Sequence, residues 1–181
     1  VEDEVVDALV SSVRKNYANL SHRYYKLKAK WFGVRQLNTW DRNAPLPEDS
    51  DRRFSWDEAR ATVLSAYGGF APEMATIAER FFDKRWIDAP PAPGKDSGAF
   101  SHSTVPSVHP YVMMNFHGKA RDVMTLAHEL GHGVHQVLAA DQGTLMSDTP
   151  LTLAETASVF GEMLTFREML NTEPNAKRRR I

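Results

Sequence analysis

The amino-acid sequence predicts a mainly α-helical fold with a small antiparallel β hairpin or sheet. Apolar residues recur at helical spacing in several long segments, whereas one short run is rich in β-favouring residues. A stretch dense in proline and glycine separates these two kinds of pattern. The segments with helical periodicity are residues 3–31, 55–68, 71–84, 120–140 and 150–171.

The N-terminal half contains three of these helices and a loop. We expect the first helix, over residues 3–31, to stop near Gly33, because glycine commonly follows the last turn of a helix. Residues 37–53 contain two prolines and several aspartates and are expected to form a loop. Ser55 and Glu58 form a capping-box pattern, in which each side chain accepts a hydrogen bond from the other's backbone N–H, so a helix is predicted to open there.

The C-terminal half combines the β-favouring run with the two last helices. Residues 88–98 hold three of the ten prolines and two glycines and are expected to form a loop. The run at residues 111–116, within the wider segment 98–116, indicates a small antiparallel hairpin or an edge strand. Thr149 and Pro150 supply an N-cap and a first helical residue for the last helix.

Composition and charge exclude several classes of function. The chain has 181 residues, with 22 basic and 23 acidic side chains, seven histidines and no cysteine. Without cysteine there is no disulfide framework, no cysteine-type zinc site and no thiol nucleophile. A net charge of −1 gives no electrostatic basis for binding nucleic acid or an anionic membrane surface. No apolar run approaches the roughly 20 residues that cross a bilayer. We therefore expect neither nucleic acid nor a membrane as a partner.

The pattern H-E-x-x-H occurs at His128, Glu129 and His132, within the predicted helix 120–140. Residues four apart lie about 40° apart around an α-helix, so both imidazoles can reach one zinc ion. Glu129 projects beside them, where its carboxylate can take a proton from a metal-bound water. The two histidines are expected to face a cleft or solvent, because the apolar stripe lies on another side of the helix. This stripe consists of Val123, Ala127, Leu130, Val134, Val137 and Leu138.

The last helix offers a third metal ligand. Glu155 and Glu162 are seven residues apart, about 20° around the helix, and share their side with Leu151, Val159 and Phe166. A carboxylate turned toward a core is costly unless a positive charge meets it, and a metal ion supplies that charge. We assign Glu155 as the third zinc ligand and expect Glu162 to hold a ligand histidine or another positive group. Two histidines and one glutamate leave a fourth position open for water, as catalytic zinc sites do.

His135 lies on the ligand side of the same helix. A three-histidine pattern, H-E-x-x-H-x-x-G-x-x-H, would need glycine at position 135 and histidine at position 138, where the sequence has His135 and Leu138. We interpret His135 as a residue of the cleft or as a donor that supports a ligand. A ligand role for His135 is the less favoured alternative.

Four short stretches, in this order, resemble the oligoendopeptidase F family of zinc metallopeptidases, which is related to thimet oligopeptidase. The resemblance is clear in the C-terminal half and weak in the first 85 residues. The stretches are Ser97-Gly98-Ala99-Phe100, Pro110-Tyr111-Val112-Met113-Met114-Asn115-Phe116, Thr125-Leu126-Ala127-His128-Glu129-Leu130-Gly131-His132 and Leu153-Ala154-Glu155-Thr156-Ala157-Ser158.

The resemblance implies a helical zincin-like catalytic core around a deep channel, acting on short peptides in the cytoplasm. It places Zn²⁺ on His128, His132 and Glu155, with Glu129 as the general base. The family also carries a stretch rich in histidine and tyrosine, well after its third ligand, that stabilises the oxyanion. No such stretch occurs in this sequence, so we expect that the zinc site can be complete while the catalytic site is not.

The resemblance also implies a substrate-binding strand formed by Gly98, Ala99, Phe100 and Ser101. An unpaired strand edge offers N–H and C=O groups to an extended peptide, so this segment is expected to pair with the substrate backbone.

We interpret residues 1–181 as a single segment of a larger metallopeptidase catalytic domain, with the rest of its own parent chain as a partner. Residues 1–85 form its helical part, residues 86–118 a loop and hairpin, and residues 119–181 a zinc-binding helix pair. The leading hypothesis is a zinc metalloendopeptidase. A zinc carboxypeptidase with the same site is an alternative, and so is a catalytically incomplete fragment that binds metal or peptide. The presence of Glu129 argues against the last, because a binding module needs no base there.

Overall fold

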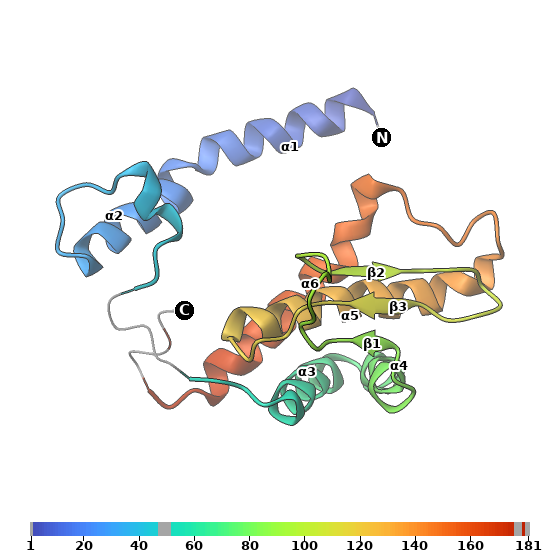
Figure 1. The fold of residues 1–181 in the computed structure, drawn as a ribbon. Coiled ribbons are helices and arrows are strands. Elements are labelled where there is room, and N and C mark those ends of the chain that lie inside the picture. The colour runs from blue at the N-terminus through green and yellow to red at the C-terminus, as the bar shows by residue number, and fades with distance from the viewer. Residues whose placement is uncertain (1, 47–51, 176–178, 180–181) are drawn as a thin grey trace. The chain divides into compact units, whose positions relative to one another are not determined.

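The computed structural model describes residues 2–46, 52–175 and 179. The chain divides into two units, Val1–Asp51 and Arg52–Ile181, and Figure 1 shows their elements in chain order. The expected fold class, mainly helical with a small sheet, is confirmed. No helix within the described ranges is long and apolar enough to span a bilayer.

The first unit is helical and differs from the prediction in one respect. Its elements are α1 (Asp3–Asn16), the π-helical turn η1 (Ala18–His22), α2 (Arg23–Trp31) and the 3₁₀ turn η2 (Thr39–Asn43). The sequence predicts one continuous helix over residues 3–31, and η1 interrupts it. A π turn follows a different period from an α-helix, so a search for 3.6-residue periodicity passes over it. Gly33 follows α2 as predicted, with a φ of +68° that favours glycine. The predicted loop 37–53 contains η2, and its residues 47–51 lie outside the described part.

The second unit carries all the candidate site residues. The predicted capping box opens α3: the Glu58 N–H donates to Ser55 Oγ over 3.1 Å, and the Ser55 N–H donates to Glu58 Oε2 over 2.7 Å. The elements of this unit are α3 (Trp56–Phe70), α4 (Pro72–Asp83), β1 (Ile87–Asp88), β2 (Phe100–His102), β3 (Tyr111–Met113), α5 (Ala120–Ala139), the 3₁₀ turn η3 (Ala140–Gln142) and α6 (Leu151–Thr172).

The sheet has the order β1-β3-β2. β2 and β3 form the expected antiparallel pair, with Ser101 opposite Val112. β1 pairs with β3 in parallel, which the sequence does not predict, because a strand of two residues is too short to show any alternation. Asp88, which the sequence assigns to a loop, is the second residue of that strand. Among the described strands, β2 is therefore at one edge of the sheet.

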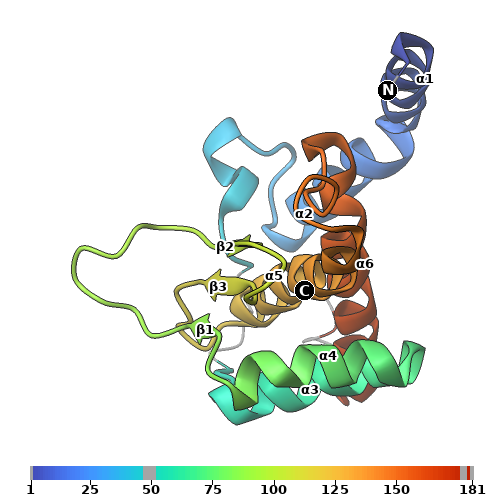
Figure 2. The same cartoon turned by 90° about the vertical axis from the view of Figure 1, so that its right-hand side faces the viewer.

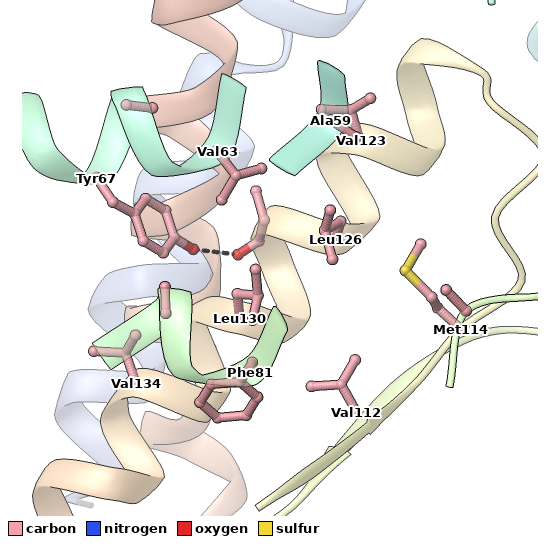
Figure 3. Packing of buried hydrophobic residues seen from close by; sticks show 14 of the residues in the cluster. Ala59, Val63, Tyr67, Phe81, Val112, Met114, Val123, Leu126, Leu130 and Val134 are labelled. Carbon is pink, nitrogen blue, oxygen red and sulfur yellow. Dashed lines mark hydrogen bonds between the residues drawn. The ribbon is translucent and has the colours of Figure 1, made fainter. Parts of the chain in front are cut away.

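The hydrophobic core surrounds α5, which contacts α3, α4, α6, β2 and β3. Figures 1 and 2 show the strands on one side of α5, with α3 and α4 side by side. Figure 3 shows the side chains that fill the space between these elements, including Tyr67 and Phe81 from α3 and α4. The Tyr67 hydroxyl donates a hydrogen bond of 2.6 Å to the buried carbonyl of Ala127 on α5, so α3 is tied to α5 by a polar bond as well as by packing.

The last helix begins one residue later than predicted. α6 starts at Leu151, and Pro150 is its N-cap, with a ψ of 141° that is not helical. The carbonyl of Pro150 accepts hydrogen bonds from the N–H groups of Leu153 and Ala154, as the carbonyl of an N-cap residue does. The assignment of Thr149 as N-cap and Pro150 as first helical residue is therefore wrong by one position.

Candidate active site

Helix α5 presents His128 and His132 on the same side, next to each other. Their ring centroids lie 4.9 Å apart, with the ring planes at 81°. Both imidazoles are partly buried, and the apolar residues behind them are largely in the core, as the periodicity predicts. Leu138 is the exception, because it is exposed near the end of the helix.

The carboxylate of Glu155 on α6 reaches both imidazoles. Its Oε2 atom lies 3.2 Å from His128 Nε2 and 3.5 Å from His132 Nε2. One ligand atom from each of these three residues falls within 4.8 Å of the others. Donor atoms around a tetrahedral zinc ion, with bonds of about 2.0–2.1 Å, are about 3.3 Å apart. The donor types and these two spacings therefore fit a zinc ion, although the group also fits other divalent metals that accept imidazole and carboxylate.

The close approach of α5 and α6 depends on Gly131, which lies between the two histidines. A Cβ atom at this position would lie 2.6 Å from the carbonyl oxygen of Ala157 and 2.8 Å from the Cα atom of Ser158. Both atoms belong to the backbone of α6 and cannot rotate away. Only glycine lets α6 come this near, and Glu155 is two residues before the point of contact.

The reason for expecting Glu155 on this side of α6 is wrong in one respect. The sequence places Glu155 and Glu162 in an apolar stripe that faces the core, but Leu151 and Val159 of that stripe are exposed. The side chain of Glu155 is itself 55% exposed and that of Glu162 is 37% exposed. The face of α6 that is buried instead consists mostly of small or polar residues, namely Ser158, Gly161, Thr165 and Met169. Small side chains allow close helix packing, so the two carboxylates lie at the rim of the core rather than inside it.

Two further side chains hold the group in place. The Ser158 hydroxyl, which is fully buried, donates to Glu155 Oε2 over 2.8 Å. The sequence reasoning missed Ser158, although its position three residues after a proposed ligand, on the same side of the helix, is a usable signal. Glu162 Oε2 lies 3.4 Å from His128 Nδ1, so the two ring nitrogens of His128 face two different carboxylates.

The surroundings shift the pKa values of three groups at this site. Burial raises the pKa of Glu129 to about 7; His128 opposes this rise and Glu155 adds to it. Burial lowers the pKa of His132, which favours the neutral imidazole that a metal binds. The hydrogen bond from Ser158 lowers the pKa of Glu155, helped by the nearby histidines and opposed by partial burial. At neutral pH the group thus offers an anionic carboxylate beside a neutral imidazole.

The other predicted site residues lie on α5 and near β2. His135 is partly buried, and it lies near enough to His132 for its charge to lower the pKa of that residue. Among the described residues it is not part of the group that could hold a metal. Phe100 and Ser101 lie in the edge strand β2, and Gly98 and Ala99 precede it. Gly98 has a φ of +95°, which favours glycine over residues with a side chain.

Two helices that carry the H-E-x-x-H pattern and a distant glutamate are typical of zinc metallopeptidases. A family model described as Peptidase family M3 matches residues 1–179, so this chain belongs to peptidase family M3. The resemblance found in the sequence is thereby confirmed.

Curated relatives match over nearly the whole chain. Oligopeptidase PepF of Bacillus subtilis (strain 168) is 31% identical over 180 residues, which are 99% of this chain and 27% of the relative. The chromosomal oligoendopeptidase F of Lactococcus lactis subsp. cremoris is 29% identical over 99% of this chain and 29% of the relative. The chain thus spans less than a third of the length of these relatives.

Solved structures share the fold. The crystal structure of a protein from Chlamydophila abortus aligns with 97% of this chain. The alignment includes 29% of the other chain and has a TM-score of 0.80 at 26% identity. The structure of PZ peptidase A with an inhibitor aligns with 93% of this chain and with 30% of its own chain, with a TM-score of 0.75. At 19% identity, the second likeness shows the fold alone.

We predict that Gly131→Ala separates α5 from α6 and weakens metal binding. The added methyl group meets backbone atoms of α6, so folding should be destabilised by about 1–3 kcal/mol and Glu155 should be moved from the imidazoles. Zinc content after dialysis and the midpoint of chemical denaturation measure the two effects.

Gly69→Ala is the matched control, because a Cβ atom at Gly69, which also lies in a helix, meets nothing within 4 Å. If Gly131→Ala behaves like this control in both measurements, the close contact does not position Glu155.

Proposed function

We propose that the intact protein is a zinc metalloendopeptidase that hydrolyses short peptides in the cytoplasm. The observation that carries the proposal is the convergence of two imidazoles and one carboxylate, from two helices, within 4.8 Å of one another. Membership of peptidase family M3 supports the same reaction class.

In this proposal His128, His132 and Glu155 hold Zn²⁺, through His128 Nε2, His132 Nε2 and Glu155 Oε2. When bound, zinc acts as a Lewis acid on a peptide carbonyl and lowers the pKa of a coordinated water to about 7. Glu162 accepts a hydrogen bond from His128 Nδ1, which would leave Nε2 of the same ring free to bind the metal. The hydrogen bond from the Ser158 hydroxyl holds Glu155 Oε2 near the Nε2 atoms of His128 and His132.

Glu129 is the proposed general base. The charges of His128 and Glu155 both act on the pKa of Glu129, which supports a position of its carboxylate near these two proposed ligands, and Glu129 is largely shielded from solvent. The carboxylate takes a proton from the attacking water and passes it to the nitrogen of the leaving amine. His135, one turn after His132 along α5, is proposed to line the same cleft.

The segment Gly98–Ser101 is the proposed substrate-binding edge. β2 is at the edge of the described sheet, and α5, which carries the histidines, contacts this strand. An extended peptide that pairs with β2 would therefore lie next to the helix that bears the metal ligands.

Removal of the proposed third ligand, Glu155, or of Ser158, which hydrogen-bonds it, should lower the affinity for zinc. We predict that Ser158→Ala weakens zinc binding about tenfold, as loss of a residue that orients a ligand does. Glu155→Ala, which removes the ligand itself, should weaken it further. Competition with a chromogenic chelator measures both affinities.

The control is Glu168→Ala, on the same helix, because Glu168 hydrogen-bonds Ser65 instead. Full zinc occupancy of Glu155→Ala would remove Glu155 from the ligand set.

Glu129→Gln should separate metal binding from chemistry. The variant keeps the shape of the side chain and loses its basic oxygen, so we expect unchanged zinc content and a kcat lower by about 10²–10⁴-fold. The assay uses an internally quenched peptide that is blocked at its C-terminus, which an endopeptidase cleaves and a carboxypeptidase does not.

Glu73→Gln is the control, because Glu73 is exposed at the start of α4. Turnover that survives in Glu129→Gln would contradict the role of base. A wild-type enzyme that cleaves only peptides with a free C-terminus would favour the carboxypeptidase.

The rest of the intact protein is the proposed partner of the first turns of α6. Leu151 is 84% exposed and Leu153 is 53% exposed, just before Glu155 on the same helix. Exposed apolar residues of this kind mark a contact surface. We predict that the isolated 181-residue chain hydrolyses the quenched peptide much more slowly than the intact protein does, when equal amounts of zinc-loaded protein are compared. Equal rates would show that the chain needs no such partner.

A further inference from the structure

The side chain of Gln136 joins the metal-binding helix to the edge strand. Its Oε1 atom accepts a hydrogen bond of 2.8 Å from the Ser101 hydroxyl, and its Nε2 group donates one of 3.1 Å to the Ser101 backbone carbonyl. Both polar groups of the amide thus form hydrogen bonds with one residue, Ser101. Ser101 is the middle residue of β2, and both side chains are partly buried.

The register of the sheet shows which way the Ser101 backbone points. The N–H of Val112 donates to the carbonyl of Trp86, just before β1, so the backbone polar groups of Val112 face β1. Val112 is the residue opposite Ser101. In an antiparallel pair, a residue that does not bond to its opposite residue turns its N–H and C=O outward. The Ser101 N–H and C=O therefore face the open edge of the sheet.

Gln136 is placed to set the position of this edge relative to the metal ligands. It follows His132 by four residues, so it lies one turn further along α5, about 6 Å along the axis and about 40° around it. The same helix thus carries the two imidazoles and, one turn later, the amide that hydrogen-bonds the strand edge. A hydrogen-bonded amide at this point fixes the distance and tilt of β2 more closely than apolar contacts alone.

We propose that Gln136 is a positioning residue for the substrate: it holds β2 so that a peptide paired with the Ser101 edge lies in line with the metal site. This inference rests on the proposed peptidase function. Both side-chain hydrogen bonds of Gln136 go to Ser101 and none goes to the His–His–Glu group, so in this proposal Gln136 acts through β2. The carbonyl of Ser101 has a second lone pair, so the bond from Gln136 leaves it able to accept a bond from a substrate.

The test compares Gln136→Met, Ser101→Ala and Ser101→Thr in the intact, zinc-loaded protein, with an internally quenched peptide as substrate. Gln136→Met loses both hydrogen bonds and keeps the length of the side chain. It should raise KM at least fivefold, about the effect of one lost hydrogen bond, with kcat changed less than KM and with the zinc content unchanged. Ser101→Ala loses one bond and should raise KM less, whereas Ser101→Thr keeps the hydroxyl and should restore a KM close to that of the wild type.

Gln142→Met is the matched control, because Gln142 lies in η3, is exposed and makes no side-chain hydrogen bond within the described part of the chain. A KM for Gln136→Met equal to that of this control would overturn the proposal. Loss of zinc in Gln136→Met would overturn it too, because the residue would then act on the metal site.

Amide hydrogen exchange separates this inference from the proposed function. Phe100 and His102 are the residues of β2 whose backbone groups face β3. Their amides should exchange faster in Gln136→Met than in the wild type, whether or not the protein cleaves peptides. Unchanged exchange would refute the positioning role. A wild-type protein that binds zinc and cleaves no peptide would refute the proposed function alone.

Discussion

The contact between α5 and α6 at Gly131 is the constraint on which the candidate site depends. At this point the backbone of α6 occupies the space that a side chain on α5 would fill. The two histidines flank the contact on one helix, and Glu155 lies just before it on the other. The spacing between the carboxylate and the imidazoles is therefore set by packing of backbone against backbone, which is stiffer than packing through long side chains.

Other close contacts fix the orientation of α5. A Cβ atom at Gly133 would lie 2.6 Å from the ring of Phe81 on α4, and one at Gly161 of α6 would meet the hydroxyl of Tyr67 on α3. The same hydroxyl bonds to the carbonyl of Ala127. These contacts prevent α5 from rotating about its axis, so the imidazoles face α6. The polar site is in this way a consequence of how the apolar side of the helix packs.

The sequence predicts the helices and the metal-ligand candidates because both depend on local spacing. A spacing of four residues on one helix fixes the relation of His128 to His132 without knowledge of the fold. The position of Glu155 relative to them depends on how two helices cross. The carboxylate lies near both imidazoles, although the apolar stripe from which the sequence predicts this position is largely exposed. Hydrophobicity selected the stripe with Val159, whereas the helices meet through Ser158 and other small residues. An apolar stripe is therefore a poor guide to the buried face of a helix where small residues on another face allow closer packing.

Features that depend on partners distant in the sequence could not be predicted. β1 exists only because β3 pairs with it, and Gln136 gains its role from Ser101, which lies 35 residues earlier. In the sequence, Gln136 is one more polar residue outside the apolar stripe of a helix. Its position one turn after His132 becomes informative only once β2 is known to lie there. The ligand face of α5 therefore continues from the metal group to the strand edge, and one rigid helix can align the site of chemistry with the backbone that it is proposed to act on.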